Sequence, residues 1–178
     1  TLVIGGDGTQ DQPRLYGNRM VYRDQTLIND SYITLIKMMD LSTGTITTLT
    51  TEDNYSYNPD IYEDYVVWVQ RPADADSTGN EIYLLDLNDI ENPQTITNNS
   101  VSDTSVRIWG DYVVYERWIV TEPSIMADIF LYRISTGQTT QITDNINYNY
   151  DDPEIHGDYL IYNDQSSCVY KYQISTGS

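Results

Sequence analysis

The sequence contains very little cysteine and histidine, two residue types on which many enzyme and metal sites depend. Its 178 residues include one of each, Cys168 and His156. A single cysteine excludes an intramolecular disulfide and a cysteine-rich metal site. No apolar run approaches the ~18 residues that a membrane-spanning helix needs, so membrane insertion is not expected.

Basic residues are also scarce, with 9 Lys and Arg against 27 Asp and Glu and a net charge of −18. A surface of this sign repels phosphate backbones and anionic lipids, so no nucleic-acid partner is expected. It suits cations, basic partners or solubility in a salty environment. The chain begins at Thr1 and shows no signal peptide, which indicates a mature form or a piece of a longer protein.

Phenylalanine is nearly absent, whereas the other aromatic residues are plentiful: there is one Phe against 17 Tyr and 3 Trp. Aromatic and β-branched residues favour half-buried strands, and short segments bounded by Gly and Pro are typical of β-rich chains. The composition therefore predicts an all-β fold.

One phrase recurs four times along the chain. Its copies are PRLYGNRMVYRD, PDIYEDYVVWVQ, VRIWGDYVVYER and PEIHGDYLIYND, which begin at Pro13, Pro59, Val106 and Pro153. The steps between them are 46, 47 and 47 residues, and a period near 45 residues with several short strands is typical of a propeller blade. We predict a single β-propeller domain over 1–178, with blades at about 13–58, 59–105, 106–152, and 153–178 plus 1–12.

Each repeat predicts a blade of four antiparallel strands. The phrase supplies a short first strand, a turn and a second strand, and a third strand follows it. In three repeats the third strand ends at the residues STG. Gly supplies a positive φ and Ser and Thr compete for local backbone hydrogen bonds, so STG is expected to turn the chain into a Thr-rich fourth strand. The fourth repeat stops before that strand.

The missing strand is expected at the other end of the chain. Residues 1–4 stand as far before Pro13 as the Thr-rich strand of the first repeat stands before Pro59. Pairing this segment with the last repeat would close a four-bladed ring and remove its exposed edges. A monomer is therefore favoured. A homodimer that forms an eight-bladed ring, and an excerpt of a larger ring, are the alternatives.

Charges of alternating sign follow the first residue of the recurring phrase. They are Arg14, Asp60, Arg107 and Glu154. Around a closed channel each charge would be flanked by two opposite ones, and ion pairs in a partly buried channel differ from surface pairs in being less screened. The alternation favours the small ring.

Three motifs carry a resemblance that covers essentially the whole chain. They are P-x-I-x-G-D-Y-V-V-Y, I-Y-L-x-D-L-S-T-G and the closing Q-I-T, and they resemble the TolB-type propeller repeats of cell-surface proteins in methanogenic archaea. The resemblance implies an extracellular β-propeller module for surface architecture or adhesion, without catalytic residues. The second repeat departs from the pattern at Glu63, which replaces the turn glycine, and at NDIENP, which replaces STG.

The only histidine does not predict a catalytic base. His156 aligns with Tyr16, Tyr62 and Trp109 of the other repeats, so this position is expected to hold a flat ring beside the turn. No G-x-S-x-G elbow accompanies the histidine. We therefore predict no catalytic residues.

The loop between the second and third strands of the third repeat contains a group of apolar residues. They are Trp118, Ile119, Val120, Ile125 and Met126. If exposed, such a cluster would mark an interaction site. If packed on its own blade, it would be a hairpin extension of the scaffold. Repeat scaffolds usually place recognition in loops that vary between units, as this one does.

The loops that join one blade to the next are rich in carboxylates and amides. Clustered Asp and Asn oxygens suit Ca²⁺, and the group of choice is Asp144, Asn145, Asp151 and Asp152. None of these loops matches the EF-hand pattern, and Asx-turns on a solvated face explain most of their composition. Calcium is one hypothesis for these loops, and no other cofactor is expected.

These features predict a non-catalytic module at the cell surface that binds a protein or polysaccharide on the loop-bearing face of a rigid ring. Two alternatives remain: a polysaccharide-degrading enzyme (a lyase or glycosidase) on the same scaffold, and a spacer without a ligand. A glycosidase would need two unpaired carboxylates ~5–10 Å apart in an open cleft. Flat faces without a pocket would favour the spacer.

Overall fold

The computed structural model describes residues 4–5, 8–28, 31–72, 79–121, 124–144, 149–164, 166 and 168–178. All regular structure in these ranges is β, which confirms the all-β prediction, and none of their residues forms a helix long and apolar enough to cross a membrane. The strands are β1 (Thr9–Tyr16), β2 (Arg19–Ile28), β3 (Ser31–Asp40), β4 (Ile46–Thr48), β5 (Asn54–Tyr62), β6 (Tyr65–Pro72), β7 (Glu81–Asp86), β8 (Gln94–Thr95), β9 (Asp103–Trp109), β10 (Tyr112–Thr121), β11 (Ser124–Arg133), β12 (Gln138–Gln141), β13 (Tyr150–His156), β14 (Tyr159–Asp164) and β15 (Val169–Gln173).

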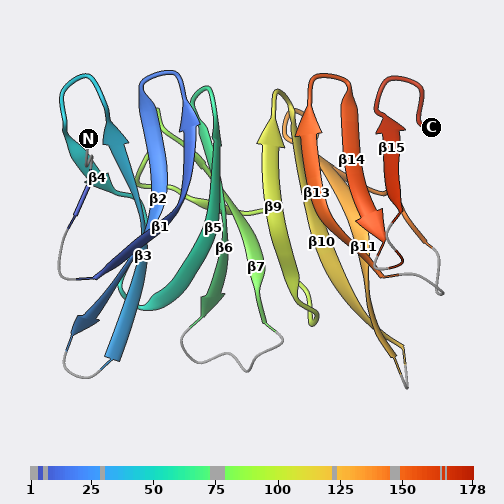
Figure 1. The fold of residues 1–178 in the computed structure, drawn as a ribbon, viewed down its shortest axis with the longest axis horizontal. Helices are drawn as coiled ribbons and strands as arrows, with labels where there is room; N and C mark the ends of the chain where they lie inside the picture. The colour runs from blue at the N-terminus through green and yellow to red at the C-terminus, as the bar shows by residue number, and fades with distance from the viewer. Residues whose placement is uncertain are drawn as a thin grey trace.

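The strands form four antiparallel groups that follow one another across the molecule (Figure 1). Blade 1 contains β1 to β4, blade 2 contains β5 to β8, blade 3 contains β9 to β12, and blade 4 contains β13 to β15. Within each blade, successive strands pair in antiparallel register. Blades 1 and 2 also share one parallel pair, Thr34 with Tyr55. The sequence repeat is therefore a repeat of blades.

The turn between the first two strands of each blade keeps one backbone conformation. Gly17, Gly110 and Gly157 have φ between 57° and 60°, and Glu63 has φ 48° at the equivalent position. The second repeat thus retains the turn in spite of its missing glycine. In blade 3 the next residue, Asp111, accepts hydrogen bonds from the backbone and hydroxyl of Ser135 at 2.7 and 2.5 Å.

The same contact links the turn motif to the STG motif in blade 4. Asp158 makes the same pair of hydrogen bonds to Ser175 in blade 4, at 2.8 and 2.6 Å. Two of the three STG serines, Ser135 and Ser175, therefore fix the end of the third strand to the turn that precedes the second, whereas Ser42 of blade 1 donates to Asp40. The glycines that follow, Gly137 and Gly177, have φ of 67° and 71°, as expected for the hairpin turn.

The closing Q-I-T motif has a separate structural role. The hydroxyl oxygens of Thr50, Thr97 and Thr143 each accept the backbone N–H of an isoleucine within the third strand, at 2.8 to 2.9 Å. A short fourth strand provides few ladder hydrogen bonds, so these side chains continue the pairing where the backbone ladder ends.

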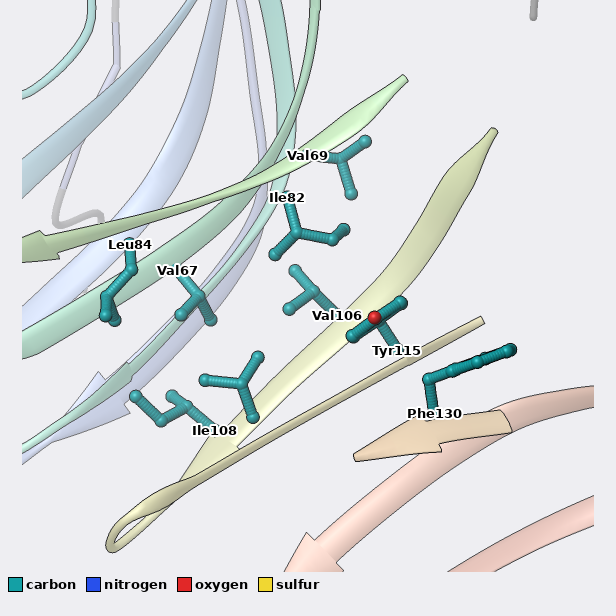
Figure 2. Packing of buried hydrophobic residues seen from close by; sticks show 9 residues of the cluster. Val67, Val69, Ile82, Leu84, Val106, Ile108, Tyr115 and Phe130 are labelled. Atoms are coloured by element: carbon teal, nitrogen blue, oxygen red, sulfur yellow. The ribbon is translucent and has the colours of Figure 1, made fainter. Parts of the chain in front are cut away.

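Apolar side chains between neighbouring blades form the core. Figure 2 shows Val67, Val69 and Ile82 of blade 2 facing Ile108 and Tyr115 of blade 3. Two more clusters join blade 1 to blade 2 and blade 3 to blade 4. Fully burying a Val, Leu or Ile side chain contributes about 1.5–3 kcal/mol. The blades are therefore held to one another mainly by hydrophobic burial, and each needs a neighbour.

The predicted closure of the ring is not present in the structure. The four blades form an open array, with blades 1 and 4 at opposite ends (Figure 1). In the part of the chain that is described, no strand pairs with the outer edge of β15. Ile4 borders the same surface hollow as Met20 and Tyr22 of blade 1. Residues 1–3 lie outside the described residues.

Candidate functional site

The first strand of each blade (β1, β5, β9 and β13), called the inner strand below, contains a bulge just before the first residue of the recurring phrase. Gln12, Asn58, Ser105 and Asp152 all have positive φ, between 49° and 55°, and the strand register shifts beside each of them. A bulge bends the strand and redirects the side chains around it. Bulges therefore shape the inner strands at one end of every blade, next to the loops that join the blades.

A cleft of about 270 Å³ opens between blades 3 and 4 beside two of these bulges. Its lining combines one aromatic, two apolar, three acidic and two neutral polar residues: Ser105, Glu116, Trp118, Met126, Ala127, Asn149, Asp151 and Asp152. Two members come from the predicted apolar group and two from the predicted calcium group. The fold therefore unites parts of both groups in a single site.

Trp118 forms one wall of the cleft. It lies in the long β10–β11 hairpin, and 45% of the residue surface is exposed. Its indole Nε1 donates a hydrogen bond to the hydroxyl of Thr104 at 3.1 Å, and its backbone N–H donates to the carbonyl of Ser102 at 2.8 Å. The side chain is thus fixed at its polar edge while much of its surface stays accessible.

The cleft takes up only part of the predicted apolar group. Trp118 pairs with Ala127, and Ile119 pairs with Met126. Trp118 and Met126 line the cleft, whereas Ile119 is not among its lining residues. Val120 and Ile125 pair with each other at the hairpin tip, but their side chains lie outside the described residues.

Glu116 is the buried carboxyl of the cleft. Its Oε1 accepts the backbone N–H of Asp152 at 2.8 Å, and its Oε2 accepts the hydroxyl of Thr104 at 3.2 Å. Burial raises the pKa of this carboxyl, and the negative charge of Asp151 raises it further, against the lowering effect of the hydrogen bonds. The cleft therefore contains both a carboxyl with a raised pKa, Glu116, and the exposed indole of Trp118.

The calcium group is only partly assembled. Asp151 and Asp152 line the cleft, Asp144 is exposed at the end of the preceding described segment, and Asn145 lies outside the described residues. Among the residues that the structure describes, no three His, Cys, Asp or Glu side chains are arranged to hold a metal ion. The calcium hypothesis stays a prediction.

The four predicted channel charges form two ion pairs between neighbouring blades. The Arg14 guanidinium lies 3.9 Å from the Asp60 carboxylate, and Arg107 lies 2.9 Å from Glu154. Asp60 also accepts the backbone N–H of Ile108 at 3.0 Å. Burial raises the pKa of Asp60, while the backbone hydrogen bonds and the two arginines oppose that rise. These charges link the inner strands of neighbouring blades.

A row of rings lies along the turns of the four blades. Tyr16 contacts Tyr62, Tyr62 contacts Trp109, and Trp109 contacts His156, with ring centroids 4.9, 4.7 and 3.9 Å apart. His156 therefore occupies the last ring position, as the repeat alignment predicts. Trp68 packs in the core against Tyr83 and is 1% exposed.

Sequence reasoning missed four members of the cleft: Ser105, Glu116, Ala127 and Asn149. The residues equivalent to Glu116 in the other blades are Arg23, Val69 and Asn163, so this position is polar in three of the four repeats and a carboxyl there does not stand out. No sequence signal marks the other three residues.

Neither a protein-family model nor a curated protein matches the sequence. Solved structures do. TolB from Acinetobacter baumannii is 16% identical, with a TM-score of 0.69 over 99% of this chain and 44% of that chain. The β-propeller domain of the Trilobed protease from Pyrococcus furiosus is 13% identical, with a TM-score of 0.65 over 88% and 48%. An oligogalacturonate lyase in complex with manganese is 16% identical, with a TM-score of 0.65 over 100% and 55%.

These likenesses define the fold. The chain is a β-propeller protein, and its blades have a TolB-like arrangement. It spans about half the length of each of these three structures.

Proposed function

We propose that the chain is a non-catalytic module of an archaeal cell-surface or other extracellular protein, which binds a polysaccharide or a protein in the cleft between blades 3 and 4. The observation that carries the proposal is the exposed indole of Trp118 in a cleft that also contains carboxylates and an amide. The resemblance of the repeats to archaeal surface proteins supports the location.

The chemistry of the cleft favours a neutral polysaccharide as the first ligand to test. An aromatic ring offers a flat apolar surface to the C–H face of a sugar ring, while carboxylate and amide oxygens accept hydrogen bonds from sugar hydroxyls. The net charge of −18 opposes an anionic polysaccharide. A cationic protein segment is the second ligand class that the charge allows.

The test is calorimetric titration of the chain with neutral oligosaccharides. We expect Trp118→Ala to weaken binding about tenfold or more, because the ring contact is lost while the fold is kept. Ile90→Ala removes an equally exposed apolar side chain from the turn after β7 and is the control that should bind normally. Equal affinity of the wild type and Trp118→Ala would refute the site. Binding of cationic peptides alone would select the protein ligand.

Glu116 favours a second candidate function, a polysaccharide lyase or glycosidase. A buried carboxyl with a raised pKa beside Asp151 and Asp152 has the character of a general acid. Incubation with polysaccharides, followed by assays for new reducing ends and unsaturated products, tests this candidate. Turnover that disappears in Glu116→Gln would support it, and binding without turnover would leave the non-catalytic proposal standing.

A further inference from the structure

Each blade has a forward face, which is directed to the next blade of the array, and a rear face, which is directed to the preceding one. The forward face of blade 4 is apolar and exposed, although the same face of every other blade is buried. Val21, Val67 and Val114 occupy one repeat position and are fully buried, whereas Ile161 at this position is 45% exposed. One repeat position of the third strand shows the same pattern: Ile36, Ile82 and Ile129 are fully buried, and Val169 is 76% exposed. In blades 1 to 3 these residues pack on the next blade. Among the residues that the structure describes, blade 4 has no such neighbour.

The rear face of blade 1 shows the complementary exposure. Ile61, Ile108 and Ile155 are 3 to 7% exposed because each packs on the preceding blade, whereas Leu15 at the same position is 63% exposed. The forward face of blade 4 and the rear face of blade 1 therefore correspond, position by position, to two faces that pack together at every internal junction.

The order of charges along the inner strands and the order of rings along the turns are also complementary at the two ends of the array. Along the inner strands the order is Arg14, Asp60, Arg107, Glu154, so the next charge in the series would be positive, as Arg14 is. Along the turns, the ring of His156 ends the row that begins at Tyr16. The side chain of Glu154 is 56% exposed and that of Arg14 is 37% exposed, so both can take a further partner.

We propose that a second copy of this chain packs blade 1 against blade 4, head to tail, at two identical junctions. Glu154 then pairs with Arg14 of the second copy, and Tyr16 of the second copy continues the row of rings. A twofold axis closes such an assembly into eight blades without a free end face, since a head-to-tail contact forms a ring wherever its rotation closes.

Light scattering on a size-exclusion column tests the proposal. The wild-type chain should have twice the 20.5 kDa mass of one chain. Val169→Glu places a charge in the junction and should weaken association at least ~tenfold, whereas Ile90→Glu, which lies on neither end face, should keep the wild-type mass. A wild-type mass of one chain, or of more than two, would overturn the proposal, as would a Val169→Glu dimer of wild-type affinity.

A charge exchange gives a sharper test, because it should restore the association of two chains as well as remove it. Arg14→Glu and Glu154→Arg each place like charges across both junctions, so each variant by itself should dissociate at low ionic strength. Mixing the two variants restores an opposite pair at each junction and should return a two-chain species. Circular dichroism checks that both variants fold. Folded variants that dimerise alone, or that stay apart when mixed, would contradict the pairing.

Discussion

At the scale of single residues, comparison of the repeats shows which positions require a particular backbone conformation and which accept different residue types. The turn position needs a positive φ, and three repeats use glycine because it has no Cβ to clash in that conformation. Glu63 adopts the same conformation with a side chain, at a cost of about 1–2 kcal/mol. Its backbone carbonyl accepts a hydrogen bond from Arg19 at 2.7 Å, which helps to hold it there.

Glu63→Gly is therefore expected to stabilise the fold by about 1 kcal/mol, measured by urea unfolding. Gly110→Ala is the reciprocal variant, because a Cβ at Gly110 would meet no atom within 4 Å and only its φ of 58° opposes the substitution. It should lose a similar amount. An unchanged or lower stability of Glu63→Gly would show that the side chain contributes more than the backbone strain costs.

The turn carboxylates predict a pH dependence. Hydrogen bonds from the Ser175 hydroxyl and from the Gln173 amide lower the pKa of Asp158 below its ordinary value. The unfolded chain then takes up a proton at a higher pH than the folded chain, so this contribution to stability is complete above about pH 5 and is lost as the pH falls below about 4.

Ser175→Ala should raise the pKa of Asp158, followed by carbon-detected NMR of the carboxyl group. The stability difference between the wild type and the variant should shrink as the solution is acidified. Thr176→Ala is the control, because its hydroxyl donates to the carbonyl of Gln173 rather than to a carboxylate, so its effect should not vary with pH. An unshifted Asp158 titration in Ser175→Ala would contradict the assigned cause.

At the scale of the element, a blade depends on side chains that end its strands. The hydroxyl of Thr143 accepts the N–H of Ile129 at 2.9 Å and donates to the carboxylate of Asp128 at 2.7 Å, with all three residues buried. Burial raises the pKa of Asp128, and the Thr143 hydrogen bond counteracts that rise. The threonine thus satisfies a backbone donor and an acid together.

Thr143→Val keeps the shape of the side chain but removes both hydrogen bonds. We expect it to cost about 1–3 kcal/mol of unfolding free energy, because it leaves a buried donor and a buried acceptor without this partner. Thr140→Val, in the exposed strand β12, should change stability by less than about 0.5 kcal/mol. Equal effects of the two variants in chemical unfolding would contradict the role of Thr143.

Much of the blade was predictable because four copies of one pattern average out the ambiguity of any single strand. The turns, the ring at His156 and the order of strands follow from that comparison. The cleft was only half predictable. Trp118 and Asp152 stand out in the sequence, but their presence in one cleft depends on the bulge in β13 and on the path of the β10–β11 hairpin. Neither leaves a sequence pattern.

At the scale of the whole molecule, the period of a repeat does not determine the curvature of the array. The prediction of a self-closed ring depends on a count of strands, and a ring made of two chains satisfies the same count. What distinguishes the cases is burial. Ile161, Val169 and Leu15 are exposed at positions that are otherwise core, so among the described residues both ends of the array lack the neighbours that cover these positions elsewhere.

The assembly of two copies can be tested most directly by a cross-link across the junction. In blades 1 and 2, Thr34 pairs with Tyr55. Cys168, the only cysteine, follows the position equivalent to Thr34, and Thr9 is equivalent to Tyr55. Both are exposed. A short bismaleimide should therefore join Cys168 to a Thr9→Cys residue in a second chain and produce a covalent two-chain species on a denaturing gel. A cross-link confined to a single chain, or none at all in the folded protein, would contradict the account.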